Sequence, residues 1–237
     1  MKRSSVLDIL KSVAVVNMVA YHTLYDVVYI FGVPVAFMGT RASFVWQQAI
    51  CWTFILVSGA LSLSSRKPYR RAAVVFGGGL LLTAVTYTVM PSERLSFGIL
   101  HFRGAAAFLT ALLRPALNRI PAAAGAAVSA ALFAVSYTVP HGHLAFFGTE
   151  LPEFLYNARW LFFAGFMPPG FYSADYFPLI PWLFLFWTGL FAWRIIGPKL
   201  ADVPRIGACE WISRRTLLIY LLHQPVAYGI LFVCFSL

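Results

Sequence analysis

The chain has 237 residues, of which 60% are hydrophobic and only 11% are charged, and its formal net charge is +10. A soluble domain carries about 25% charged residues, so this composition excludes an ordinary soluble protein and indicates a polytopic α-helical membrane protein. The alternating pattern of outer-membrane β-strands is absent, and we assign the excess of Lys and Arg to membrane orientation rather than to nucleic-acid binding.

Seven apolar stretches are long enough to cross a bilayer as helices of about 20 residues. In chain order they cover residues 7–31, 44–64, 72–90, 97–113, 122–139, 177–196 and 216–235. The longest polar connection, 140–176, contains a segment at 155–167 that is too short to span the membrane. We expect this segment to be a lid or a re-entrant piece buried in protein. The prediction is an all-α transmembrane bundle that forms a single domain over residues 1–237.

Basic residues set the expected orientation. With a cytoplasmic N-terminus, the turns at 66–71, 114–121 and 198–215 lie inside and, together with the N-terminal segment, hold most of the 18 Lys and Arg residues. Few basic residues then lie outside, and cytoplasmic loops of membrane proteins carry such an excess. The connection 140–176 is therefore expected on the outer side.

Titratable side chains lie inside several of the predicted helices. His22 and Asp26 are four residues apart on the first helix, so they share one face. A central Asp costs roughly 2.5 to 3.5 kcal/mol in a membrane helix, so we expect this face to point toward protein or water. The orientation places polar groups from four segments in one slab between the midplane and the outer surface. These groups are His22, Asp26, His101, Arg103, Asp175, Tyr176, His223 and Gln224.

A histidine oriented by a carboxylate can deprotonate an amine or hydroxyl, or can itself accept an activated acyl group. His22 is therefore the expected catalytic residue, as base or as transient acceptor, and Asp26 is its expected orienting partner. The other six polar groups are expected to line the cavity and bind substrate. Basic residues near the inner side can attract a phosphorylated cytosolic ligand; they are Lys11, Arg66, Lys67, Arg70 and Arg71.

Each of these residues also has a purely structural interpretation. His22 can make a polar interhelical contact, His101 can be an interfacial residue, and Arg103 can neutralise a nearby carboxylate. No metal site is expected, because the loop histidines lack further ligands at a suitable spacing. Hydrolase elbow, P-loop and zincin motifs are absent from the sequence. A proton-coupled transporter or flippase, and a structural membrane subunit, remain alternatives to an enzyme.

Four stretches carry a resemblance to a known family. They are Asp8 to Lys11 (DILK), Phe97 to His101 (FGILH), Ser173 to Trp182 (SADYFPLIPW) and Tyr220 to Pro225 (YLLHQP). In that order they resemble small bacterial membrane proteins with a heparan-alpha-glucosaminide N-acetyltransferase-type catalytic domain, which is similar to the wider transmembrane acyltransferase superfamily.

The resemblance implies a multi-pass protein of the bacterial inner membrane. It implies that an acetyl group moves from cytosolic acetyl-CoA to an amine or hydroxyl of a sugar or glycan at the extracytoplasmic face, with a buried histidine as the catalytic residue. The expected partners are this acceptor and the lipid bilayer, without nucleic acid or a metal. Self-association into a homo-oligomer is left open.

Overall fold

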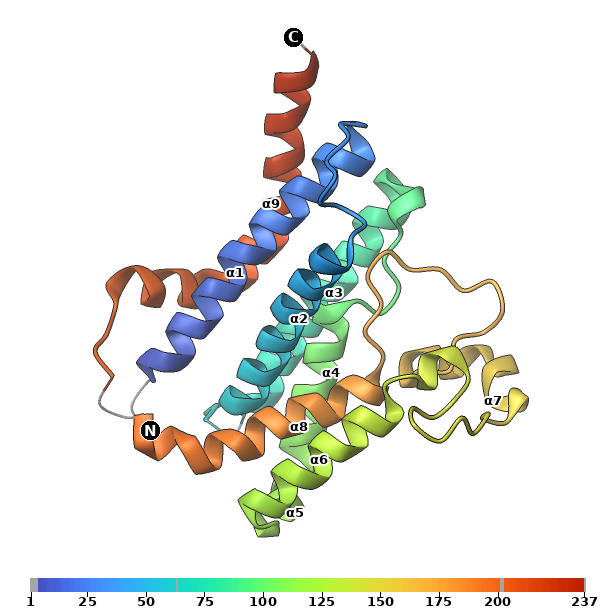
Figure 1. The fold of residues 1–237 in the computed structure, drawn as a ribbon. Coiled ribbons are helices and arrows are strands. Elements are labelled where there is room, and N and C mark those ends of the chain that lie inside the picture. Colours follow the sequence, from blue (N-terminus) through green and yellow to red (C-terminus); the bar gives the residue numbers. More distant parts are fainter. Residues whose placement is uncertain (1–3, 63, 201–202, 237) are drawn as a thin grey trace. The chain divides into compact units, whose positions relative to one another are not determined.

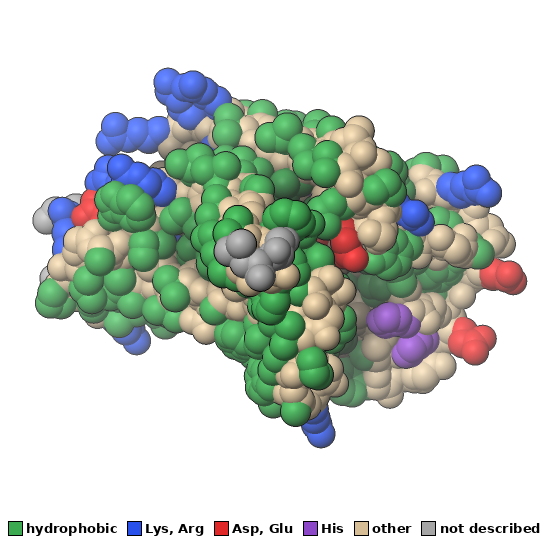
Figure 2. Space-filling view, turned by 90° about the horizontal axis from the view of Figure 1, so that it is seen from above, with side chains coloured by type: hydrophobic (Ala, Val, Ile, Leu, Met, Phe, Trp, Pro, Cys, Tyr) green, Lys and Arg blue, Asp and Glu red, His purple; other side chains and the backbone are tan. Residues whose placement is uncertain are grey.

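The fold is helical, as predicted (Figure 1). The computed structural model describes residues 4–62, 64–200 and 203–236. Six helices of this part of the chain are long and apolar enough to cross a bilayer, and a seventh apolar helix, Ile99–Leu112, is shorter. The face seen in Figure 2 is dominated by hydrophobic side chains. The chain is therefore a multi-pass helical membrane protein.

The chain forms two compact units, Met1–Phe54 with Leu200–Leu237, and Ile55–Lys199. The single domain expected over residues 1–237 stays a prediction. The first unit contains α1 (Ser5–Tyr25), the π-helix η1 (Asp26–Ile30), the first part of α2 (Arg41–Ser62) and α9 (Gly207–Ser236). The second unit contains the rest of α2, α3 (Pro68–Val89), η2 (Pro91–Glu93), α4 (Ile99–Leu112), α5 (Arg114–Arg119), α6 (Ala122–Ser136), η3 (Val139–His141), α7 (Glu153–Asn157), η4 (Arg159–Ala164), α8 (Leu179–Ile196) and most of η5 (Gly197–Leu200).

In the first unit α1 packs along α9 (Figure 1). Helix α9 begins at Gly207, well before the apolar stretch predicted to start at residue 216. The extra turns are polar, but their side chains interact between positions four residues apart. Arg214 forms an ion pair with Glu210, and the Arg215 guanidinium lies 4.5 Å from the centre of the Trp211 ring. Such i, i+4 pairs stabilise a helix that hydrophobicity alone does not reveal.

In the second unit α3 packs along α4, and α6 packs along α8 (Figure 1). Helices α2 and α8 also approach closely, because each presents a glycine to the backbone of the other. A Cβ on Gly59 would collide with the Phe186 carbonyl, and a Cβ on Gly189 would collide with the Leu56 carbonyl. Small residues let helices in lipid come close enough for extensive van der Waals contact.

Helix α4 begins deeper than the sequence suggested. Gly79, the twelfth of the 22 residues of α3, abuts the His101 ring, and Gly104 abuts Phe76. His101 therefore lies midway along α3, whereas we expected it in the outer part of the membrane. The chain reaches this depth before it becomes helical, so α4 has only 14 residues.

The segment before α4 is held by the segment before α8. The Ala174 amide donates to the Arg94 carbonyl at 3.1 Å, and the Phe177 amide donates to the Phe97 carbonyl at 3.0 Å. Backbone groups buried away from water need such partners. Phe97 has φ 59°, an uncommon conformation for a bulky residue. These two extended segments together bring the N-terminus of α4 into the interior of its unit.

The connection 140–176, expected on the outer side, folds into short helical turns between α6 and α8. Its apolar part forms η4, where the Phe162 carbonyl accepts a hydrogen bond of 2.5 Å from the Tyr176 hydroxyl. The Phe162 ring also makes an edge contact with Phe97, with centroids 6.2 Å apart. The segment 155–167 is thus attached to the start of α4. Its assignment as a lid or a re-entrant piece stays a prediction.

Candidate functional site

Two histidines from opposite ends of the chain meet in the first unit. His22 Nδ1 on α1 and His223 Nε2 on α9 are 3.0 Å apart, and the ring centroids are 4.9 Å apart. The other ring nitrogen of His223, Nδ1, lies 2.7 Å from the Tyr220 carbonyl oxygen. The carbonyl and the two rings therefore form one chain of hydrogen bonds.

The Tyr220 carbonyl sets the direction of this chain. A carbonyl oxygen can only accept, so His223 Nδ1 carries a proton and donates it. In a neutral ring Nε2 is then the acceptor, and His22 Nδ1 must be the donor to it. The lone pair of a neutral His22 is left on Nε2, as a general base or an acyl acceptor requires. Sequence reasoning missed the role of Tyr220, although its position three residues before His223 on a helix was visible.

Asp26 lies one turn beyond His22, where α1 changes into the π-helix η1. Its side chain is completely buried, with 0% exposure. Asp26 Oδ1 accepts a hydrogen bond of 2.7 Å from Gln224 Nε2. We predicted that Asp26 orients His22. In the structure His22 is hydrogen-bonded to His223, and Asp26 accepts its hydrogen bond from the side-chain amide of Gln224. Single π-turns within α-helices are frequent at functional sites.

Lys11 belongs to a group of polar contacts between α1 and α9. Its Nζ donates to the Ser213 carbonyl at 2.7 Å, and the Ser213 hydroxyl donates to Asp8 Oδ1 at 2.6 Å. The neighbouring Ser12 hydroxyl donates to the Cys209 carbonyl at 2.6 Å. These contacts explain Lys11 as part of a helix pair, and its predicted contact with a phosphorylated ligand stays a prediction.

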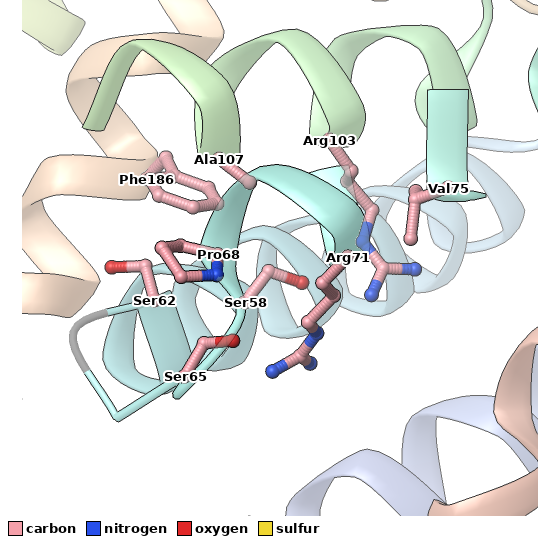
Figure 3. Close-up of a pocket in the computed structure, with 9 residues that line it drawn as sticks. All are labelled: Ser58, Ser62, Ser65, Pro68, Arg71, Val75, Arg103, Ala107 and Phe186. Carbon is pink, nitrogen blue, oxygen red and sulfur yellow. The ribbon is translucent and has the colours of Figure 1, made fainter. Parts of the chain in front are cut away.

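A cationic pocket opens in the second unit. It is lined by two guanidinium groups, from Arg71 and Arg103, and by three serines, Ser58, Ser62 and Ser65. Figure 3 shows both guanidinium groups projecting to the same side of the pocket. The pocket outlines about 420 Å³ of space outside protein atoms, part of which is open solvent. Guanidinium donors beside hydroxyl groups are a chemical match for phosphate oxygens.

The basic turn predicted from the sequence forms one wall of this pocket. Arg71 lines the pocket, and Arg66, Lys67 and Arg70 are exposed on the same turn. Sequence reasoning missed the three serines. The spacing of Ser58 and Ser62, four residues apart on a helix that leads into a basic turn, was the available signal.

Arg103 was expected in an outer cavity with His101, but it lines the pocket with Arg71. The reason is the depth at which α4 begins: the first turn of α4 already lies midway along α3, so Arg103 lies nearer the basic end of that helix. The sequence pattern gives almost the same helix, from residue 97 rather than Ile99, but it does not show which part of α3 the start of α4 lies beside.

His101 is a buried packing residue in this structure, with 5% of its surface exposed. Its ring stacks on Phe97, with centroids 5.8 Å apart, and makes an edge contact with Phe76 at 5.2 Å. His101 Nε2 lies 3.5 Å from the Thr83 hydroxyl oxygen. These neighbours favour the structural interpretation of His101, and its predicted contact with substrate stays a prediction.

Asp175 caps the N-terminus of α4 from a distant part of the chain. Its Oδ2 accepts a hydrogen bond of 2.9 Å from the Ile99 amide, one of the amides that a helix leaves without an internal partner. Burial raises the pKa of the Asp175 carboxyl to about 6, and the hydrogen bond from Ile99 opposes this rise. Burial also raises the pKa of the Tyr176 hydroxyl, which donates to the Phe162 carbonyl.

The structure thus divides the eight predicted polar groups equally. His22, Asp26, His223 and Gln224 belong to the first unit, and His101, Arg103, Asp175 and Tyr176 belong to the second. Their roles in catalysis and binding stay predictions. Together, the spanning helices, the histidine pair and the cationic pocket define a multi-pass membrane protein with polar groups built into its helices.

Comparison with known families identifies the chain more closely. A sequence model described as "Heparan-alpha-glucosaminide N-acetyltransferase, catalytic" matches residues 3–225. The chain therefore belongs to this family, and so to a family of membrane acetyltransferases. The match covers all four stretches that carried the resemblance in the sequence. Searches of curated proteins and of solved structures found no match.

Proposed function

We propose that the protein transfers an acetyl group from cytosolic acetyl-CoA to an amine or hydroxyl of a sugar or glycan at the extracytoplasmic face of a bacterial inner membrane. The observation that carries the proposal is the hydrogen-bond chain from the Tyr220 carbonyl through His223 to His22. In a member of an acetyltransferase family, this chain leaves His22 Nε2 with the lone pair that the reaction needs.

The proposed reaction uses that lone pair to move one proton. The acceptor's nitrogen or oxygen attacks the acetyl carbon and gives its proton to His22 Nε2. The bond from acetyl carbon to CoA sulfur breaks as the new bond forms, and the leaving thiolate takes the proton from His22. Protonated His22 shares its charge with His223 through their hydrogen bond of 3.0 Å. Atoms and charge balance without a metal or a redox partner.

A second route uses the same nitrogen as a nucleophile. His22 Nε2 then accepts the acetyl group first, and the acceptor removes it in a second step. The two routes differ in one measurable way. Incubation with radiolabelled acetyl-CoA alone labels the protein on the covalent route, whereas no label stays on the protein if His22 acts only as a base.

The cationic pocket supports the choice of donor. CoA carries a pyrophosphate and a ribose phosphate, and the pocket offers the guanidinium groups of Arg71 and Arg103 beside three serine hydroxyls. Hydrogen bonds to charged groups contribute roughly 1.5 to 3 kcal/mol each, which suits a site that must retain a highly charged donor. Exposed Arg66, Lys67 and Arg70 on the same turn add attraction at longer range.

The test is release of CoA thiol by the purified protein when acetyl-CoA and an amino sugar are supplied together. The proposal predicts acceptor-dependent release, with the acetyl group recovered on the sugar. Uptake of the sugar into proteoliposomes that contain no CoA would favour the transporter alternative instead. Absence of both activities over a panel of amino and hydroxyl sugars would contradict the proposed acceptor class.

A further inference from the structure

A small hairpin between α6 and α7 exposes two phenylalanine side chains on the protein surface. The Leu144 amide donates to the Thr149 carbonyl at 2.9 Å, and the Leu151 amide donates to the Gly142 carbonyl at 2.8 Å. The connecting tip contains Phe146 and Phe147, whose side chains are 86% and 67% exposed. Phe146 adopts φ 68°, a left-handed conformation that bulky side chains rarely adopt.

This hairpin is fastened to the end of a membrane helix. The Ala145 amide, next to the tip, donates to the Val135 carbonyl in the last turn of α6 at 2.9 Å. The Thr138 hydroxyl donates to the His143 carbonyl at 2.8 Å at the base of the hairpin. The chain therefore leaves α6, turns, and comes back beside it.

The returning tip reaches the level of the membrane span. The candidate span runs over Ala122–His141, and Val135 lies six positions before its end. Because α6 ends at Ser136 and the residues from 137 to 141 form a turn and a 3-10 helix, the tip meets α6 in its last turn, near that end of the candidate span. Further along α6, Val128 and Leu132 are also exposed apolar side chains within the span.

Polarity changes along the hairpin in the direction that an interface requires. The tip is apolar, whereas His141 and Glu150 at the base are exposed and polar. Aromatic side chains gather where hydrocarbon meets lipid head groups, and an apolar tip with a polar base is suited to this boundary.

We propose that Phe146 and Phe147 insert into the lipid leaflet beside the Ser136 end of α6 and anchor the outer connection there. The lipid is the occupant that the geometry favours, because the exposed apolar tip is hydrogen-bonded to the end of a helix long and apolar enough to cross the bilayer. The anchor fixes one end of the connection whose other end, at Asp175, caps α4. This inference does not depend on the acetyltransferase reaction.

The test uses spin labels on the full chain in nanodiscs of phosphatidylcholine and phosphatidylglycerol. In a chain whose three cysteines are replaced by serine, single labels are placed through Phe147→Cys, Leu132→Cys and Glu150→Cys. Collisions with oxygen report lipid, and collisions with a nickel chelate report water. The proposal predicts that the label at 147 resembles that at 132, with several-fold fewer nickel collisions than at 150.

Two results would overturn the proposal. Equal nickel accessibility at 147 and 150 would place the tip in water, and protection of 147 from both oxygen and nickel would place it against protein. If the cysteine-free chain is not recovered folded, Phe147→Trp and Glu150→Trp in the native chain replace the labels. Brominated lipids should then quench the fluorescence added by the first variant and not that added by the second; equal quenching contradicts the anchor.

Discussion

In the first unit, two hydrogen bonds decide which nitrogen of His22 carries the proton, and therefore which one is available as a base. The Tyr220 carbonyl fixes the proton of His223 on Nδ1, and His223 in turn fixes the proton of His22. We therefore propose that His223 is a positioning residue, which holds the tautomer and orientation of His22 through their hydrogen bond. Asp26 and Gln224 tie the same two helices together one turn further along.

Substitution of His223 tests this positioning role. We expect His223→Ala to lower kcat about 10- to 100-fold with little change in KM, because His22 loses the acceptor that keeps its lone pair on Nε2. His223→Gln should keep more activity, since its amide oxygen can accept the same hydrogen bond. The measurement is kcat against pH, and the acid limb should move in the alanine variant. An unchanged limb with unchanged kcat would show that His223 only packs.

The pocket arginines give a prediction about the donor. Arg103→Ala or Arg71→Ala should raise KM for acetyl-CoA roughly tenfold or more, since each removes a charged hydrogen-bond donor from the pocket. Arg70→Ala, next to Arg71 but not among the residues that line the pocket, is the matched control and should change KM little. Steady-state kinetics with acetyl-CoA and with acetyl-pantetheine make the comparison.

Acetyl-pantetheine, the second acetyl donor, distinguishes a loss of phosphate binding from a general loss of folded structure. Acetyl-pantetheine lacks the nucleotide phosphates, so the penalty of Arg103→Ala should disappear with it. An equal loss with both donors, or an equal effect of Arg70→Ala, would contradict a phosphate site in this pocket.

Among the elements, α4 depends most on residues far from it in the chain. Its N-terminus is capped by Asp175, and it lies beside Gly79 of α3. A partly buried carboxyl at this position combines two opposing effects. Burial is the larger effect and raises the pKa of the Asp175 carboxyl from the ordinary 3.8 to about 6, whereas the hydrogen bond from the Ile99 amide favours the charged form.

This balance predicts a dependence of stability on pH. Because the folded pKa is raised, the carboxyl's favourable contribution is complete below about pH 3.8 and is lost as pH rises through about 6. Asp175→Asn keeps an acceptor for Ile99 but cannot titrate. The thermal midpoint of the variant minus that of the wild type should therefore rise between pH 4 and pH 7. A constant difference, or one that falls, would contradict the raised pKa.

A substitution that adds one methyl group to α8 tests the close contact between α2 and α8. Gly189→Ala should lower the free energy of unfolding by about 1 to 3 kcal/mol, because the new Cβ meets the Leu56 backbone. Gly77→Ala on α3 is the control, since its Cβ would have no neighbour within 4 Å and Ala favours a helix. Thermal unfolding in detergent compares them. Equal loss in both variants would mean that helix contact at Gly189 is not the cause.

At the scale of the whole molecule, hydrophobic length was sufficient to predict the order of the long apolar helices, although α4 is shorter than a full span. Each apolar run of membrane length corresponds to a helix of the structure, because a bilayer leaves the backbone few other ways to satisfy its hydrogen bonds. The histidine pair could be predicted only in part: His22 and His223 were both candidate site residues, but their mutual hydrogen bond depends on how α1 and α9 pack.

The remaining features depend on contacts that hydrophobicity does not encode. The depth of His101 depends on backbone hydrogen bonds between Arg94 and Ala174, which are distant in the chain. The pocket role of Arg103 follows from that depth. The early start of α9 depends on the pair Glu210 and Arg214. In each case a tertiary or side-chain contact decides a position that periodicity leaves open.

The central claim is that His22 acts on the acetyl group, and one measurement tests it most directly. Proteoliposomes are loaded with radiolabelled acetyl-CoA and supplied outside with an amino sugar, and the rate of label transfer is compared between wild type and His22→Gln. The account predicts transfer by the wild type and a loss of at least about 100-fold in the variant, with the thermal midpoint retained. Transfer by His22→Gln at the wild-type rate would contradict it.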